Sequence, residues 1–263
     1  MKYKSILSSL EDGVLTLTMN RPEKLNAWTY QMGDELQDAI TLGNSNPDVK
    51  AFVLTGAGRG FCAGADIKAL FKVQADSGNV REGKSEPRDW VGLVRRSKPM
   101  VAAINGAAIG VGLTQVLPMD VIVSSTAAIF SVRFIKMGLV PELASSHFLM
   151  ARTGFGAANE LMLSGGTIDA DEALKIRLID KLVAPDELLN VAQATAISMG
   201  NNPSSTLLKV KELITQNMME SDLGIVQKRE MAALLECYES AEHQEAINAF
   251  LEKREPNFAA HKT

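Results

Sequence analysis

The chain has 263 residues, 46% of them hydrophobic and 22% charged, which is enough for one large globular domain or one domain with a helical appendage. The net charge of −4, without a long run of either sign, argues against nucleic acid as the main partner. The chain has two cysteines far apart in sequence, which does not indicate a disulfide framework and predicts a cytoplasmic protein. Its three histidines lack the spacing of metal ligands, so we expect no metal site, and the absence of triad spacing disfavours a triad hydrolase.

Apolar runs and periodicity predict a parallel α/β core in the first part of the chain. A strand at residues 14–19 is broken by Arg21-Pro22. The elements expected after it and before Pro141 are strands at residues 51–55, 101–104, 121–125 and 128–132, and helices at 29–42, near Asp66, at 90–96 and at 110–117. Residues 75–89 lack periodicity and are predicted to form a loop, a candidate lid.

After Pro141 the pattern becomes helical. The expected helices lie at residues 145–151, 157–163, 171–177, 187–199, 204–219, 223–239 and 241–253. The break at Asn201-Asn202-Pro203 separates an α/β core at residues 1–200 from a helical tail at 201–263. Because the tail is amphipathic and long, we expect it to pack on the core, on another subunit, or on both.

One uncharged stretch resembles a membrane span in length. Residues 99–119 follow three basic residues, but they are rich in alanine and glycine and contain Asn105, Gln115 and Pro118. A core strand followed by a buried helix explains this composition better, so we expect no membrane span.

Two glycine-rich breaks, each after an apolar run, are the most informative feature of the chain. They lie in residues 51–67 and 99–112, and each pattern predicts a buried strand, a loop and a new helix. Glycine lets the backbone approach a ligand closely, and a new helix offers free N–H groups. Two such groups aimed at one point would form an oxyanion hole that stabilises an enolate. For either loop alone, an ordinary βα turn remains the alternative.

Four segments together resemble the crotonase superfamily, also called the enoyl-CoA hydratase/isomerase family. They are NRPEKLNAW, GRGFCAGADI, INGAAIGVG and FLEKREPNF, and the resemblance covers nearly the whole chain. It implies a crotonase-like spiral of ββα turns with a C-terminal helical trimerisation region, and a homotrimer that can pair into a dimer of trimers. It also implies an acyl-CoA substrate, with coenzyme A as part of the substrate and no separate cofactor.

The resemblance also implies roles for single residues. The oxyanion donors would be the backbone N–H groups of Ala65 and Val111, although a common pattern has glycine at the second position. The coenzyme A nucleotide pocket would be formed by Lys24, Leu25, Ala63, Asp66 and Ile67. Lys24 and, from a neighbouring subunit, Lys253 are candidates for the phosphates, and a solvated lysine is the alternative for both.

Hydratases of this family add water with two glutamates. At the matching positions this chain has Thr114 and Phe134, neither of which can act as a general acid or base in that role. Two-glutamate hydration is therefore disfavoured.

A candidate catalytic carboxylate lies elsewhere in the chain, at Glu142 in the segment GLVPELASS. The segment resembles the signature of Δ3,Δ2-enoyl-CoA isomerases, in which a glutamate after proline, followed by paired serines, is the base. Pro141 suits a first helical turn, so we expect Glu142 beside the positive end of that helix. A purely stabilising first-turn acid is the alternative.

The mechanism that this implies is a proton shift. Glu142 would take a proton from C2 of a 3-enoyl-CoA, Ala65 and Val111 would hold the dienolate oxygen, and the proton would return at C4 to give the 2-enoyl-CoA. The apolar residues near Glu142 in the sequence would raise the pKa of its carboxyl group. The alternative is that they only form part of the hydrophobic core. The alternatives are hydration with one carboxylate, CoA-ester hydrolysis, decarboxylation, and a non-catalytic acyl-CoA-binding or scaffold protein.

Overall fold

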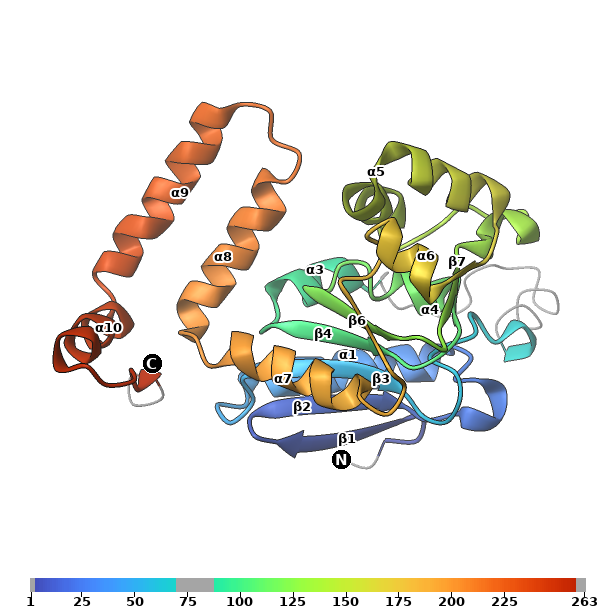
Figure 1. The fold of residues 1–263 in the computed structure, drawn as a ribbon, viewed down its shortest axis with the longest axis horizontal. Helices are drawn as coiled ribbons and strands as arrows, with labels where there is room; N and C mark the ends of the chain where they lie inside the picture. The colour runs from blue at the N-terminus through green and yellow to red at the C-terminus, as the bar shows by residue number, and fades with distance from the viewer. Residues whose placement is uncertain (1–2, 70–87, 259–263) are drawn as a thin grey trace.

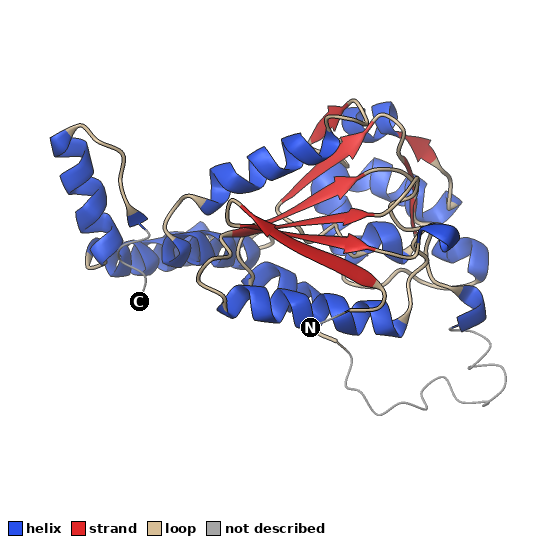
Figure 2. Ribbon diagram, turned by 90° about the horizontal axis from the view of Figure 1, so that it is seen from below, coloured by secondary structure: helices blue, strands red, loops and turns tan. Residues whose placement is uncertain are grey.

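A six-stranded sheet lies at the centre of the computed structural model, which describes residues 3–69 and 88–258 (Figure 2). In spatial order its strands are β1 (Ile6–Glu11), β2 (Val14–Met19), β3 (Ala51–Gly56), β4 (Met100–Ile104), β6 (Val121–Ser125) and β9 (Lys181–Val183). β1 and β2 form an antiparallel hairpin, and every following pair is parallel. The predicted parallel α/β core is therefore confirmed.

The hairpin strand β1 was not predicted. Only its first residue, Ile6, is buried, so the strand has no apolar alternation from which it could be recognised. Its turn is better marked, because Asp12 and Gly13 have φ values of 49° and 79°, as a two-residue hairpin turn requires.

Helices cover both faces of the sheet, and side chains alternate between the faces with the two-residue period of a strand (Figure 2). On one face, the strands pack against α7 (Leu188–Gly200) through small residues such as Ala192 and Ala196, which let the helix lie close. On the other face lie α1 (Tyr30–Ser45) and α3 (Trp90–Arg96), capped by the side chains of Thr29 and Asp89. Burial on both faces explains the continuous apolar run of β4.

A smaller sheet and several short elements extend this core toward the glycine loops. Its three strands are β5 (Ala108–Ile109), β7 (Ile129–Ser131) and β8 (Ile168–Asp169). The helical elements around it are α4 (Val111–Thr114), the 3-10 helix η2 (Arg133–Met137), α5 (Ser145–Ser164) and α6 (Ala170–Lys175). The helix predicted at residues 110–117 is thus shorter than expected, and the two predicted within α5 are joined across a non-helical residue, Gly154.

The last three helices form an arm that extends to one side of the core (Figure 1). They are α8 (Ser204–Asn217), α9 (Leu223–Tyr238) and α10 (Ala241–Glu252). Apolar side chains remain exposed along this arm, among them Leu223, Leu235 and Phe250. In the described part of the chain, no helix combines the length and hydropathy that crossing a membrane requires. Most of the predicted lid, residues 75–87, lies outside the described residues.

Candidate active site

The two glycine-rich loops, which are far apart in sequence, meet along their backbones. The amide of Cys62 donates to the carbonyl of Ala107 at 2.8 Å, and the amide of Ile109 donates to the carbonyl of Cys62 at 3.0 Å. Cys62 and Ala108 form a parallel bridge. The two loops are therefore held together as one unit.

This close approach requires glycine. A Cβ atom on Gly112 would lie 2.2 Å from the carbonyl oxygen of Cys62, and one on Gly106 would lie 2.2 Å from that of Arg59. Real Cβ atoms do not come so near to backbone, so any side chain at these positions would push the loops apart.

The amides of Ala65 and Val111 are both free at this junction. Each follows a glycine with positive φ, Gly64 at 101° and Gly110 at 55°. Within residues 3–69 and 88–258, neither amide donates a hydrogen bond to another protein group. Val111 is the first residue of α4 and needs no left-handed backbone itself, because Gly110 makes the turn. Two free N–H groups on fused loops are the feature that an oxyanion hole requires.

The Ala65 peptide is fixed by a short bridge to Trp28. The amide of Trp28 donates to Gly64 at 2.8 Å, and the amide of Asp66 donates to Trp28 at 2.9 Å. A helix begins at Ile67, directly after the loop, as the sequence predicted. This arrangement holds the peptide between Gly64 and Ala65 rigid.

Asp66 organises the residues predicted to bind the coenzyme A nucleotide. Its carboxylate accepts hydrogen bonds from Arg21 at 2.9 Å and Lys24 at 3.4 Å, and from the amide of Ala69 at 3.2 Å. The Arg21 hydrogen bond is the main cause that lowers the pKa of Asp66 to about 2. Lys24 is thus an ion-pair partner of Asp66 rather than a free loop lysine, and its side chain stays about half exposed.

Asn26 is a site residue that the sequence interpretation missed. Its buried side chain accepts from the amide of Arg21 at 2.8 Å and donates to the carbonyls of Ala57 and Gly60 at 2.9 and 2.8 Å. Its φ of 55° follows a φ of 49° at Leu25, so the loop makes two left-handed steps. Asparagine tolerates this conformation better than most residues, and this preference is the sequence signal that could have identified the position.

The other predicted nucleotide-pocket residues line the same loop junction, with one exception. Ala63 donates its amide to the carbonyl of Leu25 at 3.0 Å, and Ile67 is exposed. Lys253 caps the C-terminus of α10, on the opposite side of the molecule from α4 (Figure 1). Within one chain, Lys253 is not brought to the other residues, and its predicted role requires a neighbouring subunit.

Glu142 lies in the loop between η2 and α5, not in a helix. The prediction that Pro141 occupies a first helical turn is wrong, because α5 begins at Ser145. Leu143 and Ala144 have φ values of 55° and 52°, and these left-handed steps interrupt a helical path from Pro141. Two consecutive left-handed residues without glycine are strained, and such strain is often found next to functional groups.

The carboxylate of Glu142 has no hydrogen-bond or ion-pair partner among the described residues. Desolvation by the surrounding protein raises its pKa above the ordinary 4.5. The residue is nevertheless exposed in the single chain, so the rise reflects crowding on part of the carboxyl rather than full burial.

Thr114 and Phe134 occupy the two positions where hydratases of the resembled family have glutamate. Thr114 is fully buried on α4, and its hydroxyl has no hydrogen-bond partner within the described part of the chain. Phe134 lies in η2. The amide of Gly110 donates to the carbonyl of Ser131 at 2.8 Å, which ties the second glycine loop to the strand that leads through η2 to Glu142.

Cys62 and a metal centre are the alternative reactive groups to consider in the described residues. Burial raises the pKa of the Cys62 thiol to about 11, so it stays protonated at neutral pH. Among residues 3–69 and 88–258, no group of three histidine, cysteine or carboxylate side chains lies close enough to hold a metal ion.

Comparison with known proteins identifies the family of this fold. Residues 9–261 match the model of the family described as Enoyl-CoA hydratase/isomerase. The chain belongs to the enoyl-CoA hydratase/isomerase family. A 1,2-epoxyphenylacetyl-CoA isomerase from Escherichia coli K12 is 33% identical over 96% of this chain and 97% of its own length. A short-chain-enoyl-CoA hydratase from Clostridium acetobutylicum is 31% identical over 97% of both chains.

Solved structures of this family share the fold. An enoyl-CoA hydratase from Bacillus anthracis has a TM-score of 0.86 at 26% identity, over 97% of this chain and 99% of its own. The expected crotonase-like α/β fold is therefore confirmed, and the protein is an acyl-CoA-processing member of the enoyl-CoA hydratase/isomerase family.

Proposed function

We propose that the protein is a Δ3,Δ2-enoyl-CoA isomerase with Glu142 as its single base. The observation that carries the proposal is the distribution of carboxylates. Thr114 and Phe134 carry none at the two hydratase positions, whereas the carboxylate of Glu142 has no partner among residues 3–69 and 88–258. Two of the features that such a reaction needs are supported by the described residues: amides without protein partners on the two joined loops, and a carboxylate without a partner at Glu142.

In the proposed reaction, the thioester oxygen of a 3-enoyl-CoA accepts hydrogen bonds from the amides of Ala65 and Val111. Glu142 removes a proton from C2, and the electron pair moves through the thioester to give a dienolate. The two donors stabilise this charge by roughly 3 kcal/mol each. The protonated Glu142 then returns the proton at C4, which gives the 2-enoyl-CoA.

A single carboxylate suffices because both carbons lie on the same chain, within reach from one side. A raised pKa suits this role, since a base whose pKa lies nearer the working pH is both ionised and basic enough to take the proton. No cofactor is needed beyond the coenzyme A that the substrate carries.

The contacts around Asp66 support the nucleotide half of the proposal. The side chain of Lys24 pairs with Asp66 and stays half exposed, and Ile67 offers an exposed apolar side chain. We propose that Lys24 approaches the phosphates while Leu25, Ala63, Asp66 and Ile67 surround the adenine. The exposed apolar side chains of the arm support a homotrimer, in which Lys253 of one subunit would reach the phosphates bound by another.

The test is a product assay with the purified protein and 3-hexenoyl-CoA or 2-hexenoyl-CoA. We expect 3-hexenoyl-CoA to become 2-hexenoyl-CoA, without a 3-hydroxyacyl product from either substrate. The Glu142→Gln variant should lose at least two orders of magnitude in turnover while still binding hexanoyl-CoA. Glu11→Gln, on the exposed edge strand β1, is the matched control and should be fully active. A 3-hydroxyacyl product, or near-normal isomerisation by Glu142→Gln, would refute the proposal.

A further inference from the structure

The arm is attached to the core by a buried lysine. Lys211 is the one buried residue among the fourteen of α8, all of which the structure describes, and it is 5% exposed. Helix α9 has no buried residue. A helix that docks through an ammonium group instead of an apolar stripe is unusual, since lysine is rarely buried unless it is paired.

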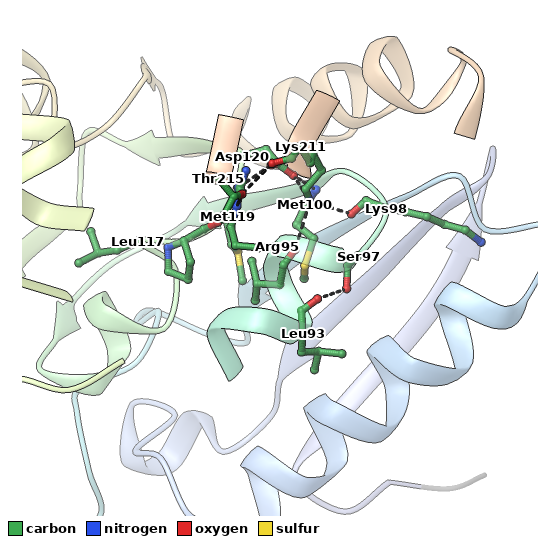
Figure 3. Close-up of polar contacts among 12 residues, drawn as sticks. Leu93, Arg95, Ser97, Lys98, Met100, Leu117, Met119, Asp120, Lys211 and Thr215 are labelled. Atoms are coloured by element: carbon green, nitrogen blue, oxygen red, sulfur yellow. Dashed lines mark hydrogen bonds and ion pairs between the residues drawn. The ribbon is translucent and has the colours of Figure 1, made fainter. Parts of the chain in front are cut away.

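All three donors of the Lys211 ammonium have acceptors in the core (Figure 3). Its Nζ atom lies 2.8 Å from Oδ2 of Asp120, 3.1 Å from the carbonyl of Val94 and 3.4 Å from the carbonyl of Lys98. Oδ2 of Asp120 also accepts from the amide of Met100 at 2.8 Å, so the carboxylate is fixed against the first residue of β4.

A second contact ties the next turn of α8 to the same carboxylate. Nη1 of Arg95 lies 2.9 Å from Oδ1 of Asp120 and 2.9 Å from the carbonyl of Pro118. Nε of Arg95 donates to the hydroxyl of Thr215 at 3.0 Å, and Thr215 follows Lys211 by one helical turn (Figure 3). We call Lys211, Asp120, Arg95 and Thr215 the polar joint.

Apolar packing at this attachment is incomplete. A cavity of about 320 Å³ lies beside the polar joint, between α5 and α8, where Phe148, Ile214 and Met218 line it without filling it. Ile214 stays 55% exposed in the chain. Apolar contact is non-directional, whereas hydrogen bonds between buried charges fix both distance and angle.

From this geometry we infer that Lys211 is a positioning residue, which sets the direction in which the arm leaves the core. The same orientation decides where the exposed apolar side chains of α9 and α10 lie. This inference goes beyond the proposed function and does not depend on which reaction the protein catalyses.

The experiment is hydrogen–deuterium exchange of the full-length protein without substrate, with Lys211→Met as the variant. Methionine fills a similar volume and leaves Arg95 and Asp120 as a neutral pair, so the core should stay folded. We expect the amides of α8 to exchange at least tenfold faster, while those of β2, β3 and β4 remain as in the unaltered protein. Glu212→Gln, exposed on the same helix, is the matched control and should change neither.

A second variant and a second readout keep the inference testable if Lys211→Met folds poorly. Thr215→Val removes the acceptor of Arg95 Nε, together with the hydrogen bond that the Thr215 hydroxyl donates to the carbonyl of Lys211 at 2.7 Å, and leaves the Lys211 ammonium and its acceptors in place. It should speed α8 exchange by a smaller factor than Lys211→Met. Light scattering at matched concentrations should show an altered mass for Lys211→Met but not for Glu212→Gln. The inference is overturned if α8 exchange is unchanged in both joint variants, or if the sheet amides accelerate as much as those of α8, which would make Lys211 a general stabiliser.

Discussion

Replacing Asp66 by asparagine removes the charge at the centre of the predicted nucleotide pocket but keeps an oxygen for the amide of Ala69. The hydrogen bond from Arg21 is the main cause that lowers the pKa of Asp66 from 3.8 to about 2, a difference that corresponds to about 2 kcal/mol of folding free energy. Lys24 is 52% exposed, so solvent screens its share of the interaction. We therefore expect Asp66→Asn to lower the free energy of unfolding by about 1–2 kcal/mol at neutral pH.

The effect has a defined pH dependence. Because the pKa of Asp66 is lower in the folded than in the unfolded chain, its charge stabilises the fold fully above pH 3.8 and loses this effect as the pH falls toward about 2. The difference between the unaltered protein and Asp66→Asn should thus be constant from neutral pH to about pH 5 and shrink below about pH 4.

Urea unfolding, followed by far-UV circular dichroism at matched protein concentrations, measures this difference at each pH. The control is Asp89→Asn: Asp89 also caps a helix and pairs with an arginine, Arg96 at 2.8 Å, but its side chain is 64% exposed. We expect that control to cost less than about 0.5 kcal/mol. Equal losses in the two variants, or a loss for Asp66→Asn that persists unchanged at pH 3, would refute the reasoning.

Three further predictions concern the loops and Glu142. Gly112→Ala places a Cβ atom 2.2 Å from the carbonyl of Cys62, so thermal unfolding should show a decrease of at least about 2 kcal/mol in the free energy of unfolding, together with lost turnover. The control Gly156→Ala meets no atom within 4 Å and lies in helix α5, so it should not destabilise the fold. Thr114→Val removes a buried hydroxyl without a partner among the described residues, so urea unfolding should show an increase of about 1 kcal/mol in the free energy of unfolding. A decrease of the same size would show that the hydroxyl has a hydrogen-bond partner. Partial desolvation raises the pKa of Glu142, and the base must be ionised to act. Turnover should therefore decrease as the pH is lowered, with a midpoint above the ordinary carboxyl pKa, and a lower midpoint would contradict this role.

Much of the core could be predicted from the sequence because its elements have strong local patterns. Strands β2, β3, β4 and β6 are apolar runs bounded by turn residues, and α1 has one apolar face. The two glycine-rich loops and the helices after them could also be placed, since glycine after a buried strand is a local signal. Strands β5, β8 and β9 have two or three residues each, too few for any periodicity.

The segment around Glu142 shows where local patterns mislead. Proline before an acid is typical of a first helical turn, yet Leu143 and Ala144 adopt left-handed conformations that delay α5 until Ser145. Neither residue has a local preference for that conformation, so the tertiary surroundings determine it.

Local sequence patterns were enough to predict an α/β core with two glycine turns and a helical tail, and the sequence has threonine and phenylalanine, not glutamate, at positions 114 and 134. Only the folded chain shows that Cys62 and Ala107 join these turns, that Asp66 pairs with Arg21, and that Lys211 binds Asp120. Periodicity and turn chemistry act over a few neighbouring residues, whereas these hydrogen bonds join segments that only the packed sheet brings together.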